Sequence, residues 1–270
     1  MAGLRRRGTG AGAGALVIVA ITGALAVANS SLTVPSGESK TGSKPCERGE
    51  LATGGGFTSS ATTRWDVLAL QPQGRRWATT LLNQGGADQQ AKVNAVCSNA
   101  SRYRLKSKEV TEPIAPFAGL TKELDVKCPS GTTAAGGGFG PTESPSSTIA
   151  PLDSAPLNDR KWHTRVYTTG GSSGGDATFR AYVVCDRKGA DYSVRSLSFT
   201  EDPPRAMRGT EVPFDESVAC GNRQRLTSGG FASDDLNVYY RRMQAAGNGW
   251  RLAGGTYTSI PITVYAVCQK

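Results

Sequence analysis

The chain has 270 residues, of which 38% are hydrophobic, 7% are aromatic and 34 are glycine. This length suits one or two ordinary domains. The many small residues, the frequent Thr and Val, and the lack of helical spacing predict an all-β fold of short strands and tight turns. The net charge of +9 favours anionic surfaces in general. It does not indicate a nucleic-acid binder, and we expect no nucleic acid as a partner.

The first segment has the pattern of an export signal. Arg5–Arg7 precede an apolar run from Ala11 to Ala28, which ends in the small-x-small sequence Ala26-Val27-Ala28. This combination predicts a signal peptide over residues 1–28. The run is also about the minimum length for an uncleaved membrane anchor. In both cases the rest of the chain is expected to be secreted or held at the cell envelope. Residues 29–45, rich in Ser, Gly and Lys, are predicted to be a flexible linker.

A motif that begins with cysteine occurs three times. Each copy places a Phe 11 residues after the Cys, with Gly-Gly directly before the Phe, at Cys46–Phe57, Cys128–Phe139 and Cys220–Phe231. The glycines permit bulges or close strand approach, and the Phe is expected to point inward. The shared spacing predicts three β-repeats, at 46–127, 128–219 and 220–270.

The repeats also end alike. Each has a Trp upstream of an apolar run that leads into a second cysteine; the pairs are Trp77 and Cys97, Trp162 and Cys185, and Trp250 and Cys268. Six cysteines in an exported chain indicate a disulfide framework. The repeat symmetry selects Cys46–Cys97, Cys128–Cys185 and Cys220–Cys268. Each bridge closes a loop of about 50 residues and is expected to contribute roughly 4 kcal/mol.

A further segment follows the first two repeats. The stretch Tyr103–Glu112 resembles Tyr192–Glu201, and the third repeat ends just after Cys268 without such a segment. Ser31–Val34, near the N-terminus, is a candidate for the missing counterpart.

The C-x-x-G-x(4)-G-G-G-F opening and the V-x-A-V-C ending resemble a repeat of exported bacterial proteins of unassigned function. They are also distantly similar to the vitelline membrane outer layer protein I family, and the resemblance covers most of 46–268. That resemblance implies three disulfide-bearing repeats in a β-prism. The Asp-Asp pair of that family occurs here once, at Asp234-Asp235. We therefore expect a β-prism-like pseudo-threefold domain, with three tandem small β-sandwich lobes as the alternative.

Two features resemble parts of catalytic sites. His163 is the only histidine, and a general base needs a nucleophile and an orienting acid nearby. Gly170–Gly174 fits G-x-S-x-G, but that motif requires a strand and then a helix, whereas here a second strand is expected. Both are interpreted as structural, so no catalytic residue is assigned. With no C-x-x-C and no calcium loop, no metal or cofactor is expected.

Two features could bind a ligand. Arg102, Arg104, Lys106 and Lys108 alternate with less polar residues, so on a strand they share one face, either as a docking stripe for an anionic polymer or as a solvated edge. Trp65 is the tryptophan outside the repeated pattern. It could stack on a sugar, whereas the three recurring tryptophans favour packing in the core.

The sequence thus predicts an exported, non-enzymatic protein with a structural or adhesive role at the cell envelope or outside the cell. A cell-wall polymer, or another anionic or carbohydrate polymer, is the expected kind of partner. A lectin-like carbohydrate binder using exposed Trp and Tyr is the alternative, and a hydrolase is a third hypothesis.

Overall fold

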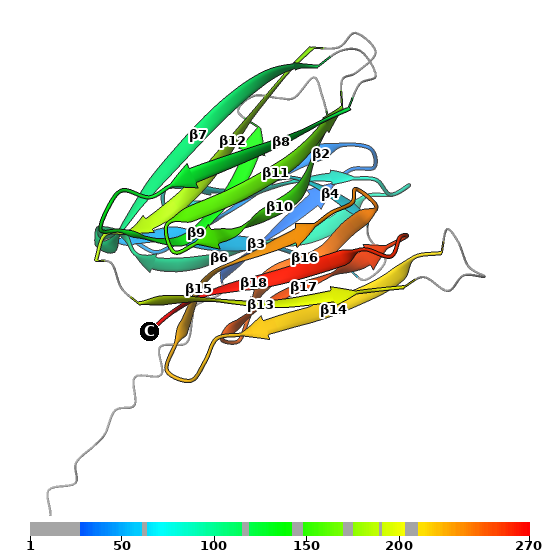
Figure 1. Ribbon diagram of the computed structural model, residues 1–270. Helices are drawn as coiled ribbons and strands as arrows, with labels where there is room; N and C mark the ends of the chain where they lie inside the picture. Colours follow the sequence, from blue (N-terminus) through cyan, green and yellow to red (C-terminus); the bar gives the residue numbers. More distant parts are fainter. Residues whose placement is uncertain are drawn as a thin grey trace, which may run out of the picture.

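The structure is a computed structural model that describes residues 28–60, 64–114, 119–141, 148–169, 175–188, 191–202 and 210–270. These residues form strands and one 3-10 turn, η1 (Ala100–Arg102), with no α-helix among them, so the prediction of an all-β fold is confirmed (Figure 1). No described segment is a helix that is long and apolar enough to cross a bilayer. The predicted export signal lies outside the described residues except for Ala28, which begins the first strand.

The repeats of the structure begin earlier than the predicted starts at 46, 128 and 220, and each supplies six strands in the same order. The first supplies β1 (Ala28–Val34), β2 (Ser39–Pro45), β3 (Glu50–Ser59), β4 (Trp65–Gln73), β5 (Arg76–Asn83) and β6 (Gln89–Asn99). The second supplies β7 (Tyr103–Ile114), β8 (Gly119–Lys127), β9 (Thr133–Pro141), β10 (Thr148–Asn158), β11 (Lys161–Thr169) and β12 (Gly175–Asp186). The third supplies β13 (Tyr192–Thr200), β14 (Val212–Ala219), β15 (Arg225–Ser233), β16 (Val238–Ala246), β17 (Gly249–Thr256) and β18 (Pro261–Gln269).

The strands form three antiparallel walls of six strands each. Wall A has the order β1-β6-β3-β16-β17-β14, wall B has β7-β12-β9-β4-β5-β2, and wall C has β13-β18-β15-β10-β11-β8. Walls A and B are joined into one continuous sheet by a single further pair, Tyr240 with Trp65.

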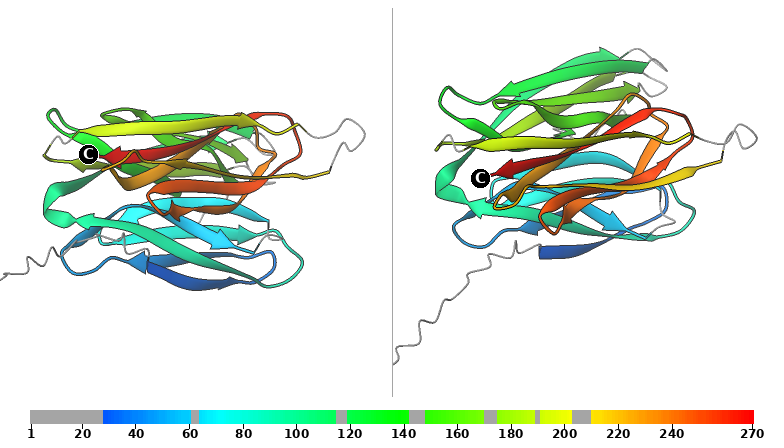
Figure 2. Two further views of the ribbon diagram at one scale, coloured as in Figure 1. Left: turned by 90° about the horizontal axis from the view of Figure 1, so that it is seen from below. Right: turned by 60° about the horizontal axis from the view of Figure 1, so that its bottom comes forward.

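The three repeats interlock through their hairpins. In every wall, three strands of one repeat pair with the hairpin of another repeat. We call these three strands, in their order in the wall, the outer, closing and opening strands; they are β1-β6-β3, β7-β12-β9 and β13-β18-β15. The hairpins are β16–β17 in wall A, β4–β5 in wall B and β10–β11 in wall C. Each motif Phe lies opposite a hairpin residue of that other repeat, in the pairs Phe57–Met243, Phe139–Leu70 and Phe231–Ser154. Figure 2 shows the orange hairpin of the third repeat against the cyan strands of the first. The alternative of three separate lobes is therefore wrong.

The glycines of the motif allow this close packing. In each Gly-Gly pair a Cβ on the first glycine would collide with the Trp of its own repeat: Gly55 with Trp77, Gly137 with Trp162 and Gly229 with Trp250. A Cβ on the second would collide with a backbone carbonyl of the neighbouring repeat's hairpin: Gly56 with Met243, Gly138 with Leu70 and Gly230 with Ser154. The motif is thus required both for packing within a repeat and for contact between repeats.

The opening strands also meet one another. Thr53 Oγ1 donates to the carbonyl of Thr227 (2.7 Å), and Thr227 Oγ1 donates to the carbonyl of Ala135 (2.9 Å). Ala135 is the equivalent residue of the second repeat and has no hydroxyl, so one bond of this three-part ring is missing. The phenylalanines and recurring tryptophans of all three repeats belong to one buried apolar cluster.

The predicted disulfide pairing is confirmed. Bridges join Cys46 to Cys97, Cys128 to Cys185 and Cys220 to Cys268, at sequence separations of 51, 57 and 48 residues. Each bridge links the turn before an opening strand to the closing strand of the same repeat, so every repeat is closed by its own covalent bond.

The prediction of a flexible linker at 29–45 is wrong, because this region forms β1 and β2. Strand β1 pairs with β6 as β7 pairs with β12 and β13 with β18, so Ser31–Val34 is indeed the missing counterpart. Leu32 and Val34 pack against the core, which holds the strand in place. Each repeat of the structure therefore begins two strands before its first cysteine. The predicted boundaries at 46, 128 and 220 would cut each repeat after its second strand.

Candidate functional site

Tryptophan does not form a sugar platform in this structure. Trp65, Trp77, Trp162 and Trp250 are all buried, with 0–2% of their surface exposed. Trp65 was the predicted ligand-binding candidate, and that assignment is wrong because it packs in the core beside the contact between walls A and B.

The predicted basic stripe is only partly on one strand. Arg102 lies in the 3-10 turn before β7, where its guanidinium makes a bidentate bond with Asp186 (2.6–2.9 Å). Burial alone would raise the pKa of Asp186, but hydrogen bonds from Arg102, the Lys188 amide and Tyr192 outweigh it and lower the pKa. Arg102 is therefore committed to a structural ion pair and is unavailable to a ligand.

Arg104, Lys106 and Lys108 do share one face of β7 and are exposed. They lie opposite Cys185, Val183 and Ala181 of β12, at the edge of wall B. Within the described residues none of the three forms an ion pair. They remain a solvated row of cations.

His163 belongs to a network of charged residues on wall C. Its Nδ1 lies 2.9 Å from Asp125 Oδ1 and its Nε2 lies 3.8 Å from Asp153 Oδ2. The hydrogen bond with His163 lowers the pKa of Asp125. Burial raises the pKa of Asp153, against the opposing effect of Arg165, whose Nε is 2.7 Å away.

The same network links two repeats. The carboxylate of Asp153, on β10, also accepts from the amide of Ser233, on β15, at 3.0 Å. Among the described residues, no serine hydroxyl contacts His163. The network therefore ties the second repeat's hairpin to the third repeat's opening strand. The G-x-S-x-G stretch at 170–174 lies outside the described residues.

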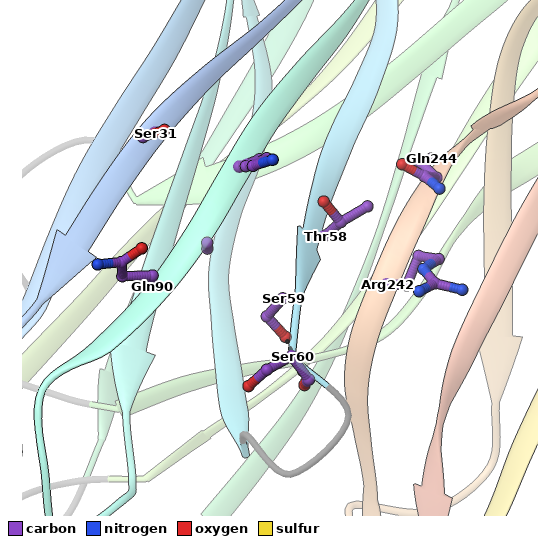
Figure 3. Close-up of a pocket in the computed structure, with 9 residues that line it drawn as sticks. Ser31, Thr58, Ser59, Ser60, Gln90, Arg242 and Gln244 are labelled. Carbon is purple, nitrogen blue, oxygen red and sulfur yellow. Dashed lines mark hydrogen bonds between the residues drawn. The ribbon is translucent and has the colours of Figure 1, made fainter.

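Wall A carries a hollow in two adjoining parts. One part, of about 490 Å³, is lined by Ser31, Thr58, Ser59, Ser60, Gln90, Ala91, Lys92, Arg242 and Gln244 (Figure 3). A second part, of about 300 Å³, lies toward β14 and shares Ser59 and Arg242 with the first. We call the two parts together the wall A groove.

The floor of this groove is one row of residues across all six strands. The pairing register places them in the order Ser31, Lys92, Thr58, Arg242, Ala253 and Asp215. Six strands at about 4.8 Å spacing give the row a length of roughly 24 Å. The groove therefore crosses the strands and has room for an extended ligand.

Positive charge dominates the row. Lys92 is exposed and forms no ion pair with any described residue. Arg242 NH1 is 3.6 Å from Asp215, whose carboxylate is also bound bidentately by Arg251. The single acid is thus shared by two arginines. The sequence did not reveal this site, because Lys92 and Arg242 are brought together only by the contact of the first repeat with the third repeat's hairpin.

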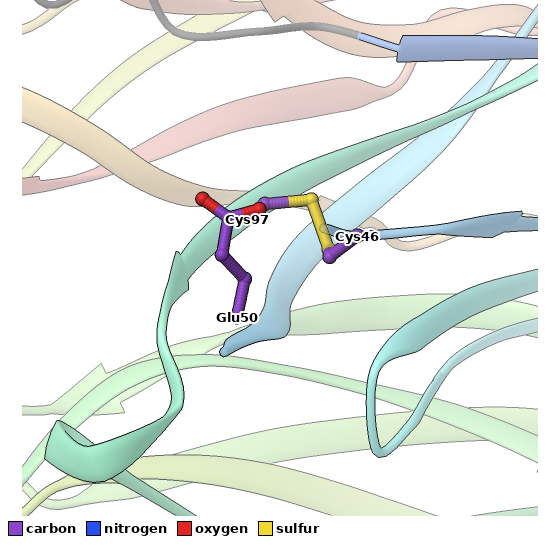
Figure 4. Close-up of side chains that lie close together, drawn as sticks. All are labelled: Cys46, Glu50 and Cys97. Carbon is purple, nitrogen blue, oxygen red and sulfur yellow. A yellow bond between two sulfur atoms is a disulfide. The ribbon is translucent and has the colours of Figure 1, made fainter. Parts of the chain in front are cut away.

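One grouping of potential metal ligands has a different explanation. The side chains of Cys46, Glu50 and Cys97 lie close together, and Figure 4 shows the two sulfurs joined as a disulfide beside the carboxylate. With both sulfurs bonded to each other, a single carboxylate is left as a donor.

Neither a protein-family model nor any curated protein matches this chain.

Proposed function

We propose that this chain is an exported, non-enzymatic protein with a structural or adhesive role at the cell envelope or outside the cell, where its surface contacts a polymer. The observation that carries the proposal is the closed ring of three repeats, each with its own disulfide. Disulfides persist in oxidising compartments. Because every repeat completes a neighbour's wall, the three repeats are held in one structure, which suits long survival outside the cell.

The N-terminal sequence supports the same proposal. The apolar run ends at Ala28, where β1 begins, so cleavage after Ala28 would leave a chain that starts within wall A. Removal of the apolar segment would then take only the first residue, Ala28, from the described fold.

Cell fractionation of a C-terminally tagged chain tests the proposal. We expect disulfide-bonded protein in the medium or envelope fraction, with N-terminal sequencing reading from Asn29 if the segment is cleaved and from Met1 in membranes if it is kept. The double substitution Ala26→Leu and Ala28→Leu removes the small-x-small pattern and should abolish cleavage. Reduced protein of full length in the cytoplasm would refute the proposal.

Carbohydrate binding is the second candidate function. It is favoured by the serine, threonine and glutamine side chains that line the wall A groove, since hydroxyl and amide groups are suitable partners for sugar hydroxyls. Tryptophan would take no part. Screening the purified protein on neutral glycans tests this candidate, and silence across the panel would count against it.

A further inference from the structure

The geometry points to the wall A groove as a binding site for a linear anionic polymer, whose successive carboxylate or phosphate groups pair with Lys92 and Arg242. This inference rests on the proposed export, because it places the groove where envelope polymers are found. The two cations occupy strands on either side of Thr58, so their Cα atoms are about 10 Å apart. A single small anion is therefore less suited to both than a chain with repeated charges.

The other two walls provide an internal comparison for Lys92. The equivalent of Lys92, five residues before the closing cysteine, is Arg180 in wall B and Thr263 in wall C. Arg180 is neutralised by an ion pair with Glu109, on the adjacent outer strand. In wall A the outer strand presents Ser31 at that place instead, so no described residue neutralises the charge of Lys92.

The same comparison applies to Arg242. It follows a register shift in β16, and the residues after the equivalent shifts are Ala69 in β4 and Asp153 in β10. Asp153 is neutralised by Arg165. In wall A, by contrast, Arg242 lies 3.6 Å from Asp215, and Asp215 is also bound by Arg251. The outer surfaces have diverged at this row, whereas the core motif is retained in all three repeats.

Two side chains near the row have buried polar atoms without a hydrogen-bond partner. The Nε of Arg242 is buried without a hydrogen-bond partner, as are both polar atoms of the Asn94 side chain. Asn94 lies two residues from Lys92 on β6 and therefore on the same face of the wall. Buried polar atoms without partners are uncommon because each costs free energy. A carboxylate or phosphate group in the groove would supply an acceptor to the guanidinium of Arg242, which lines both parts of the groove.

The groove also has a size suited to a chain rather than to a compact molecule. Its two parts share Arg242 and Ser59 and lie along one row across the strands. Ala253 lies between Arg242 and Asp215 in the row, and its small side chain leaves space for a ligand toward β14. A polymer lying across the strands would therefore meet Lys92 first and Arg242 next, with neutral hydroxyls between them.

Binding to polygalacturonate, to polyphosphate and to neutral dextran, measured by biolayer interferometry at low and high salt, tests this inference. We expect binding to at least one polyanion, weakened by salt because exposed charges are screened, and none to dextran. Carboxylate and phosphate are distinguished by which polyanion binds. The double variant Lys92→Gln and Arg242→Gln should lose about tenfold or more in affinity.

The pair Lys106→Gln and Lys108→Gln is the matched control, because it removes the same charge from the exposed row on β7. It should change affinity by less than about twofold. The single variant Ser31→Lys, at an exposed position in the row, should strengthen binding and does not depend on removing a packed side chain. Equal losses in the two double variants, or a loss in the β7 variant alone, would overturn the inference. A wild-type protein that binds neither polyanion would also overturn it, while leaving the export proposal to the fractionation result.

Discussion

Replacement of Gly137 by alanine is expected to destabilise the protein, because the added Cβ would collide with the buried Trp162. A Cβ at this position would lie 2.3 Å from Cγ of Trp162 and 2.5 Å from the carbonyl oxygen of Tyr182. Trp162 is fully buried, and its Nε1 donates to Ser154 Oγ at 3.0 Å. Overpacking costs about 1–3 kcal/mol, and displacing the indole loses a further hydrogen bond of about 1 kcal/mol.

The total of about 2–4 kcal/mol corresponds to a fall in Tm of roughly 5–15 °C for a domain of this size. Thermal unfolding followed by near-UV circular dichroism under non-reducing conditions measures it, and the tryptophan signal reports the shifted ring. Gly86→Ala is the matched control, because no atom lies within 4 Å of its added Cβ, and its Tm should change by about 2 °C or less. A Gly137→Ala protein as stable as the control would refute the packing role assigned to the glycine motif.

Three further predictions follow from the described contacts. Replacing Cys128 and Cys185 together by alanine should cost roughly 4 kcal/mol because the closed loop is long; an unchanged Tm without reductant would contradict this. Ala135→Thr should complete the hydroxyl ring and raise Tm by about 2–4 °C, whereas a lower Tm would show that the added atoms do not fit. Asp186→Asn should cost about 3 kcal/mol at neutral pH by leaving Arg102 without its partner. Because the folded-state pKa of Asp186 is lowered, its contribution is present above the unfolded pKa of about 4 and is lost as pH falls through the folded pKa. The variant should therefore show a flatter loss of stability in acid by urea unfolding, and an unchanged acid limb would argue against this role.

Covalent pairing and core positions were predictable from the sequence because they repeat. The spacing from Cys46 to Phe57 is the same in all three copies, and each copy ends in a second cysteine, so the prediction required only that the three copies fold alike. The inward position of Trp77 and its equivalents followed from the same recurrence. Trp65 has no such counterpart, and its burial depends on the contact between two walls.

The exchange of hairpins could not be derived in this way. A hairpin such as β16–β17 has the same apolar pattern whether it packs on its own repeat or on another, so one sequence pattern is compatible with lobes and with a ring. The wall A groove depends on that exchange, since Thr58 and Arg242 are far apart in the chain and adjacent only in the sheet. Strand β2 was missed because its residues are polar and exposed or half-buried, as is common at a sheet edge.

Peptide mapping of the unreduced protein, isolated from the medium or the envelope of the cells that make it, tests the central claim most directly. The structure predicts three cross-linked peptide pairs, Cys46–Cys97, Cys128–Cys185 and Cys220–Cys268, and no free thiol. Free thiols, or a bridge that joins two different repeats, would contradict a ring of separately closed repeats that functions outside the cytoplasm.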